Sequence, residues 1–230
     1  MTLRTPESAR HEIKFVAYHI HYHHILHWLH LHPAGFIVPY PERWVNNIYF
    51  DTADYTAYTD NLLGASARTK VRYRWYGKSQ TPAAGTLEIK QKRNYFGWKL
   101  HFEINDAPYT PGANWKGIYQ LLSRQLPPKG KNWLDTNPLP VLINRYFRKY
   151  FVSADGKFRV TLDNYQTVWD QRFKMYPNFS HRAILPNTFV VELKFDRTDG
   201  ALASQLIQGI PIRVSRHSKY INGVRAISGN

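Results

Sequence analysis

The chain alternates between polar and apolar residues in many short segments, a pattern typical of β-strands with two unlike faces. In residues 68–75 (R-T-K-V-R-Y-R-W), every second position holds a lysine or arginine, and Val71, Tyr73 and Trp75 stand between them. Such segments predict about eight strands, most with one apolar and one charged face. The other predicted strands are residues 10–16, 45–52, 86–93, 98–104, 141–152, 157–163 and 187–196.

Helical spacing of apolar residues appears in segments 17–32, 114–125 and 199–208. In the first of these we expect a helix whose core contacts are made by its apolar residues, with Pro33 and Gly35 ending it. The expected core contacts are Ile20, Ile25, Trp28 and Leu29.

Residues 127–140 are rich in proline, lysine, glycine and asparagine and are predicted to form a loop. The strand pattern resumes unchanged after this segment. We therefore expect a single domain over residues 1–230.

The net charge of +15 indicates an anionic partner: nucleic acid, an anionic membrane surface or a phosphate compound. Cysteine is absent, which excludes disulfides and thiolate metal sites. No apolar run approaches the roughly 18 residues of a membrane span, so no transmembrane segment is expected. The N-terminus lacks the apolar core of a signal peptide, and together these features predict a cytoplasmic protein.

Two arrangements of the two-faced strands are possible. The apolar faces could meet in a core and leave the charges in solvent, or the sheet could close with its charges inside. The second is favoured because amphipathic helices need an apolar surface to cover, the charged faces are selectively basic, and arginine suits phosphate oxygens. The expected fold class is α+β: a closed antiparallel β-barrel of about eight strands that forms a basic tunnel, with helices packed on the outside.

A series of short motifs supports this choice: H-E-I-K-F (11–15), I-Y-F-D-T (48–52), V-R-Y-R-W-Y-G (71–77), L-E-I-K (87–90), N-R-Y-F-R (144–148), R-V-T-L-D (159–163), V-E-L-K (191–194) and S-R-H-S-K-Y-I-N-G (215–223). In their order and spacing the sequence resembles the VTC domain, the polyphosphate-polymerase branch of the triphosphate tunnel metalloenzyme (CYTH-like) superfamily. The resemblance implies an antiparallel tunnel with inward lysine, arginine and glutamate side chains.

The resemblance also implies a set of site residues. Those expected to act directly on the phosphates are Lys14, Arg72, Arg74, Lys90, Arg148 and Lys219. Those expected to support substrate binding are Arg10, Lys70, Lys92, Lys99, Tyr146, Arg159, Lys194, Arg216 and Ser218. Glu192 is the first candidate ligand for Mn²⁺ or Mg²⁺, followed by Glu12 and Glu88, which could equally well form ion pairs that order neighbouring cations.

One departure bears on the reaction. Hydrolytic members of the superfamily typically begin with E-x-E-x-K, but this chain has Arg10 at the first position, before Glu12 and Lys14. Losing a carboxylate weakens a metal-bound water and adds affinity for phosphate. The sequence therefore favours a polyphosphate polymerase that transfers the ATP γ-phosphate to inorganic polyphosphate and releases ADP.

Two alternatives stay open: an inorganic or nucleoside triphosphatase, and a polyanion-binding domain without catalysis. The second is suggested by aromatic residues between the arginines, but those aromatics fall on the opposite strand face from the cations. No specific nucleic-acid partner is expected, and the sequence does not indicate an oligomeric state.

The predicted helix 17–32 is rich in histidine, including the i, i+4 pairs His19/His23 and His23/His27. Such pairs could hold a transition metal, but no carboxylate or cysteine completes the ligand set. A polar helix face is the favoured interpretation. Its positive charge would rise below the reference histidine pKa of about 6.5.

Overall fold

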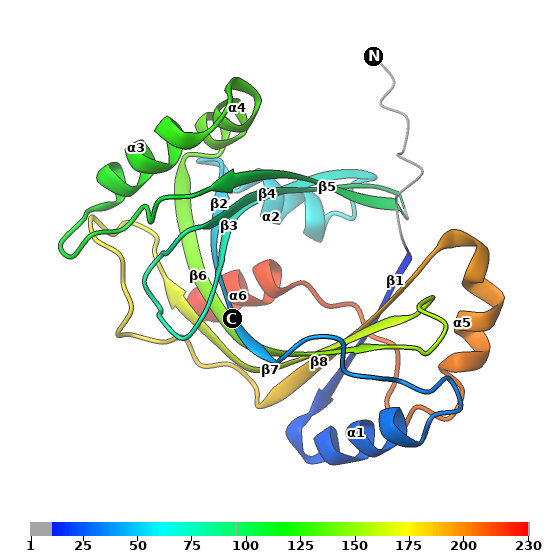
Figure 1. Cartoon of the computed structure of the whole chain (residues 1–230). Helices are drawn as coiled ribbons and strands as arrows, with labels where there is room; N and C mark the ends of the chain where they lie inside the picture. The colour runs from blue at the N-terminus through cyan, green and yellow to red at the C-terminus, as the bar shows by residue number, and fades with distance from the viewer. Residues whose placement is uncertain (1–10, 95, 230) are drawn as a thin grey trace.

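The computed structural model describes residues 11–94 and 96–229, so Arg10 lies outside the described residues. Eight strands form one antiparallel sheet in the order β1-β8-β7-β6-β2-β3-β4-β5. The sheet is strongly curled, with β3, β4 and β5 forming one wing and β7, β8 and β1 the other (Figure 1). The strands are β1 (His11–Tyr18), β2 (Arg43–Asp51), β3 (Ala67–Tyr76), β4 (Gly85–Arg93), β5 (Phe96–Ile104), β6 (Leu139–Val152), β7 (Arg159–Asp170) and β8 (Thr188–Phe195).

The prediction of a closed barrel is wrong, because the sheet is a half-barrel. Among the described residues, no pairing joins the two end strands, β1 and β5. The outer edge of β1 instead pairs with a later part of the chain: Phe15 forms a bridge with Val214, and Ser215 N donates to Lys14 O at 2.7 Å. This segment pairs with backbone groups on the outer edge of β1, which a strand that closed the barrel would otherwise occupy.

The helices only partly match the predicted ones. They are α1 (Tyr22–Leu31), α2 (Thr56–Leu62), α3 (Trp115–Gln125), α4 (Pro128–Thr136), α5 (Gly200–Leu206) and α6 (Lys219–Ile227), with short 3₁₀ turns η1 (His19–His21) and η2 (Arg197–Asp199). In the part of the chain that the structure describes, no helix has the length and apolar character to cross a membrane.

Two differences from the predicted helices have clear causes. The expected helix 17–32 begins only at Tyr22, because β1 stays paired with β8 up to Tyr18. Ile20 is consequently 79% exposed and makes no core contact, whereas Ile25 and Leu29 are buried as predicted.

The predicted loop at 127–140 contains helix α4. Proline at the first helical position, Pro128, needs no backbone donor there, and Leu134 buries its side chain completely. The helix is too short, and too rich in polar residues, for its apolar spacing to be visible in the sequence.

Helices α1, α3, α4 and α5 cover the convex side of the sheet, as predicted. Helices α1 and α5 pack on β1, β6, β7 and β8 around buried residues such as Ile25 and Leu206. Helices α3 and α4 pack on β2, β3 and β4 through residues such as Ile118, Leu122 and Leu134. Because alternate side chains point to opposite faces, these two cores turn the charged faces of the strands toward the concave side.

Helix α6 packs against β6 and β7 on the concave side, at one end of the half-barrel (Figure 1). Gly223 permits this approach, since a Cβ at that position would lie 2.7 Å from Leu142 Cδ2. Buried Asp51 links α6 to α2. It accepts hydrogen bonds from Tyr220 Oη of α6 at 2.5 Å and from Ala57 N of α2 at 3.0 Å. Helix α6 therefore fills this end of the concave face and leaves the other end open.

The junction of β3 and β4 gives a test of this fold. An ideal Cβ on Gly85 would lie 2.1 Å from Arg74 O, a backbone atom that cannot turn aside. We expect Gly85→Ala to lower the free energy of unfolding by about 1–3 kcal/mol in urea denaturation. The control Gly200→Ala, where no atom lies within 4 Å of the added Cβ, should be neutral or slightly stabilising. Equal stability of the two variants would contradict the β3–β4 register.

Candidate functional site

A band of charged side chains crosses the concave face. The structure brings together most of the residues predicted for the site. These are Lys14, Lys70, Arg72, Arg74, Lys90, Lys99, Arg148, Lys194 and Lys219, with Tyr146, Ser218, Glu12, Glu88 and Glu192. Arg159, Lys92 and Arg216 are exposed and lie outside the tightly paired part of the band.

Glu192, on β8, is the centre of one half of the band. Its carboxylate lies 3.4 Å from Lys194 Nζ and Lys219 Nζ, and 3.6 Å from Lys14 Nζ and the Arg148 guanidinium. Burial opposes ionisation, but Lys219 and Lys14 outweigh it and hold the pKa of Glu192 well below its ordinary value. One buried anion thus orders cations from four different elements.

Asp163 is a site residue that the sequence analysis missed. Its carboxylate accepts from Arg148 Nε at 2.5 Å and Nη2 at 2.6 Å, and also contacts Lys219. Burial would raise the pKa of Asp163, but Arg148 and Lys219 hold it below the ordinary value. Asp163 alternates with Val160 and Leu162 and shares a strand face with Arg159 and Thr161. This alternation indicates the charged face but not that Asp163 orients a guanidinium group.

Glu88, on β4, orders the opposite wing. It accepts from Arg72 Nε at 2.7 Å and lies 3.3 Å from Arg74 Nη1. Two further residues missed in the sequence complete the arrangement: Arg74 Nε donates to Asn47 Oδ1 at 2.9 Å, and Arg72 Nη1 donates to Tyr49 Oη at 3.3 Å. Both come from β2, whose uncharged polar residues gave no sign of a phosphate site.

The two wings meet through side chains. Lys90 Nζ of β4 lies 3.3 Å from Glu12 of β1, and Lys70 Nζ donates to Ser218 Oγ at 2.8 Å. Glu12 also lies 3.1 Å from Lys14 Nζ. Side-chain ion pairs and hydrogen bonds therefore bridge the opening that the backbone leaves.

Cations outnumber carboxylates in the band, and several lysines consequently have depressed pKa values. Burial, with repulsion from Arg72, lowers the pKa of Lys99 to about 6. Burial, with repulsion from Lys90, lowers that of Lys70 to about 7. Glu12 favours the charged form of Lys90, but burial and Lys14 prevail and lower its pKa to about 8. A bound polyanion would supply the missing negative charge.

A divalent cation would be held by Glu12 and Glu192, because these two carboxylates approach the same ammonium group. Lys14 Nζ lies 3.1 Å from Glu12 Oε1 and 3.6 Å from Glu192 Oε1. One or two carboxylates together with substrate phosphates are a usual ligand set for Mg²⁺. Glu88 lies on the other wing, where Arg72 and Arg74 hold it. Within the described ranges, no three histidine, aspartate or glutamate side chains form a metal-binding group by themselves.

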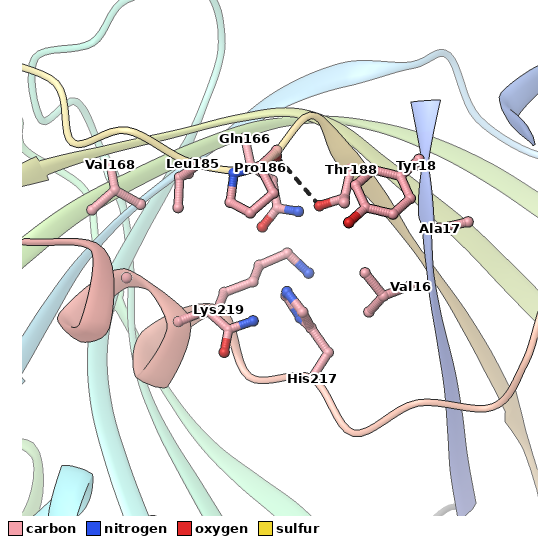
Figure 2. A pocket seen from close by; sticks show the side chains of 12 residues that line it. Val16, Ala17, Tyr18, Gln166, Val168, Leu185, Pro186, Thr188, His217 and Lys219 are labelled. Atoms are coloured by element: carbon pink, nitrogen blue, oxygen red, sulfur yellow. Dashed lines mark hydrogen bonds between the residues drawn. The ribbon is translucent and has the colours of Figure 1, made fainter. Parts of the chain in front are cut away.

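A cavity of about 260 Å³ lies beside α6, at the filled end of the half-barrel. Figure 2 shows Lys219 and His217 extending into it, opposite Val16 and Gln166. Burial, together with the charges of Lys219 and Lys14, lowers the pKa of His217 to about 3. Its ring is therefore neutral, a property that the motif around it did not indicate.

The histidines of the N-terminal helical segment take no part in the band. His23, His24, His27 and His30 are exposed on α1, which covers the convex side. They form a polar helix face on the far side of the sheet from the charged residues.

The lysine pKa values predict a proton exchange that can be measured. At pH 7.5, Lys99 and Lys70 are mostly neutral, and an anion stabilises their charged forms and raises their pKa values. Sulfate, which does not titrate in this range, should therefore bind with proton uptake and more weakly as pH rises from about 6 to 8. Titration calorimetry in buffers of different ionisation enthalpy measures the uptake, which Lys99→Gln should reduce. Proton release would contradict the assignment.

Two solved structures and one protein family are similar to this chain. The half-barrel is similar to HpAC1 from Hippeastrum, a protein named as an adenylyl cyclase with a dominant triphosphatase activity: the TM-score is 0.54, the identity 16%, and 96% of each chain is covered. A protein of Vibrio parahaemolyticus named as an adenylate cyclase matches with a TM-score of 0.48 and 14% identity, over 93% of this chain and 98% of the other. No curated protein matches the chain. The VTC domain family matches residues 9–228, and the chain therefore belongs to the VTC domain family of the tunnel fold.

Proposed function

We propose that this chain is a polyphosphate polymerase, which transfers the γ-phosphate of ATP to the end of an inorganic polyphosphate chain and releases ADP. The observation that carries the proposal is the surplus of cations over carboxylates on the concave face. Burial, together with repulsion between neighbouring cations, depresses the pKa values of Lys70, Lys90 and Lys99. A row of phosphates is the ligand that such a band would neutralise along its whole length.

The geometry suits phosphoryl transfer, in which the protein mainly holds the phosphates in line and neutralises their charge. Arg148 is oriented by Asp163, and Arg74 by Asn47. These guanidinium groups need little reorganisation when phosphate oxygens arrive, which favours electrostatic stabilisation of the transition state. A bound Mn²⁺ or Mg²⁺, held by Glu12 and Glu192, would supply further charge neutralisation.

The reaction balances without a further reactant. A terminal oxygen of the polyphosphate chain attacks the γ-phosphorus of ATP, and the bond from that phosphorus to the bridging β–γ oxygen breaks. ADP carries away the electron pair. The buried arginines, already paired through Glu88 and Asp163, stay charged throughout and move no proton.

A triphosphatase is the second candidate, supported by the similarity in fold to HpAC1, which has that activity. The first residue of R-x-E-x-K argues for the polymerase, since Arg10 stands where hydrolytic members carry a carboxylate. A third candidate, a polyanion-binding domain without catalysis, would use the same cations.

One incubation separates the three candidates. With ATP and Mn²⁺ or Mg²⁺, a polymerase forms long acid-labile chains and ADP, and a triphosphatase forms orthophosphate. A binding domain gives no turnover but binds polyphosphate with a steep dependence on salt. Orthophosphate as the main product would overturn the polymerase proposal.

Replacement of Arg74 tests the role of the band. We expect Arg74→Ala to lower turnover by about 100-fold or more, because a preoriented donor to the phosphates is lost. Folding should survive, since Glu88 keeps Arg72 as its partner. The matched control is Arg124→Ala, an exposed arginine on α3 on the convex side. Unchanged turnover in Arg74→Ala, with a normal unfolding transition, would count against the site.

A further inference from the structure

We propose that the open rim of the half-barrel binds the nucleobase of the nucleoside triphosphate, by stacking on Arg43, Tyr76 and the neighbouring tyrosines. This inference rests on the proposed function. It gives a binding place to the nucleoside, the part of the substrate that the phosphate band does not hold. It predicts that the protein distinguishes a nucleoside triphosphate from inorganic triphosphate at a defined place.

The rim holds an arginine between tyrosine rings. The guanidinium carbon of Arg43 lies 4.0 Å from the ring centroid of Tyr76 and 5.2 Å from that of Tyr150. Arg43 Nε donates to Tyr150 Oη at 3.0 Å, and the Tyr40 ring meets Tyr150 edge-on at 5.9 Å. Tyr76 is 43% exposed and Tyr40 is 61% exposed. The group is therefore both preordered and open to a ligand.

The rim is continuous with the phosphate band. Arg43 is the register partner of Arg148, whose guanidinium carbon lies 6.0 Å from the same Tyr150 ring. Tyr76 follows Arg74 by two positions on the same strand face, a separation of about 7 Å. Phosphates held by Arg74 and Arg148 would thus leave the nucleoside beside Tyr76 and Arg43.

The opposite end of the half-barrel is a poorer place for the nucleoside. Helix α6 fills it, and the remaining cavity of about 260 Å³ is lined by Lys219 and His217 on the side of α6. To enter this cavity from the band, a nucleoside would have to pass Lys219, whose ammonium group is paired with Glu192 and Asp163. The open rim has no such obstacle among the described residues.

The tyrosine rings and the guanidinium group of the rim determine how a nucleobase would be recognised. Every nucleobase has a flat π-face, which stacks on aromatic rings and on guanidinium planes without reading hydrogen bonds. ATP and GTP should therefore bind with similar affinity, and both should bind more tightly than inorganic tripolyphosphate. Removing one stacking ring typically weakens binding by about 5- to 100-fold.

Equilibrium binding of ATP and tripolyphosphate to the purified full chain tests this assignment. Tyr76→Ala should weaken ATP binding at least fivefold and leave tripolyphosphate binding within about twofold, and Tyr76→Phe should keep both affinities. Tyr40→Ala is a second variant, at a side chain that is more exposed and less prone to affect folding. The control Val16→Trp narrows the cavity and should not change the ratio of the two affinities.

Three results with the variants would overturn the assignment. They are equal loss of ATP and tripolyphosphate binding in Tyr76→Ala, no loss of either, and a selective loss of ATP binding in Val16→Trp. Wild-type protein that binds ATP and tripolyphosphate equally would overturn it as well. Failure of the proposed function is seen separately, as absence of polyphosphate synthesis, because the ratio of affinities needs no turnover.

Discussion

Lysines and arginines gathered on one concave surface repel one another, and the protein must offset this repulsion in order to fold. Glu192 and Glu88 are each shared by several cations, and Asp163 holds Arg148 with two hydrogen bonds. This sharing keeps the band assembled without neutralising it. Burial and the remaining surplus of positive charge therefore lower the pKa values of Lys70 and Lys99. The carboxylates therefore have two roles: they allow the cations to be buried, and they fix the directions of the guanidinium groups.

The helices make this arrangement possible from outside the site. An antiparallel sheet can leave one face in water, and here the wet face is the concave one because helices cover the convex face. Leu29 of α1 and Leu122 of α3 are completely buried on that convex side. Helices α2 and α6 are the exceptions, since they pack together inside the curl and close one end. The site thus has one filled end and one open rim, an asymmetry that a simple tunnel would lack.

The sequence predicts the strands and their charged faces well, because a period of two is a strong local signal. Lys14, Arg72 and Arg148 accordingly face the same concave surface, as expected.

Closure of the barrel could not be predicted from the sequence. It depends on which segment reaches the outer edge of β1, and that segment lies about 200 residues away along the chain. Helix α4 was missed because its few apolar residues sit among lysine, proline and glycine. Asn47 was missed because an uncharged amide acquires its role only when Arg74 lies beside it.

The strap formed by residues 214–219 has a consequence for how the molecule is made. Lys14 is tied to it twice, through Ser215 N and through His217 O, the latter contact spanning 203 positions of sequence. The next residues, Ser218 and Lys219, reach across to Lys70 and Glu192. During synthesis these positions follow Lys14 by about 200 residues, so the first cations of the band lack their contacts with the strap until that part of the chain has been made. Contacts of such long range form slowly, and the anion-binding surface is expected to be the last feature to mature.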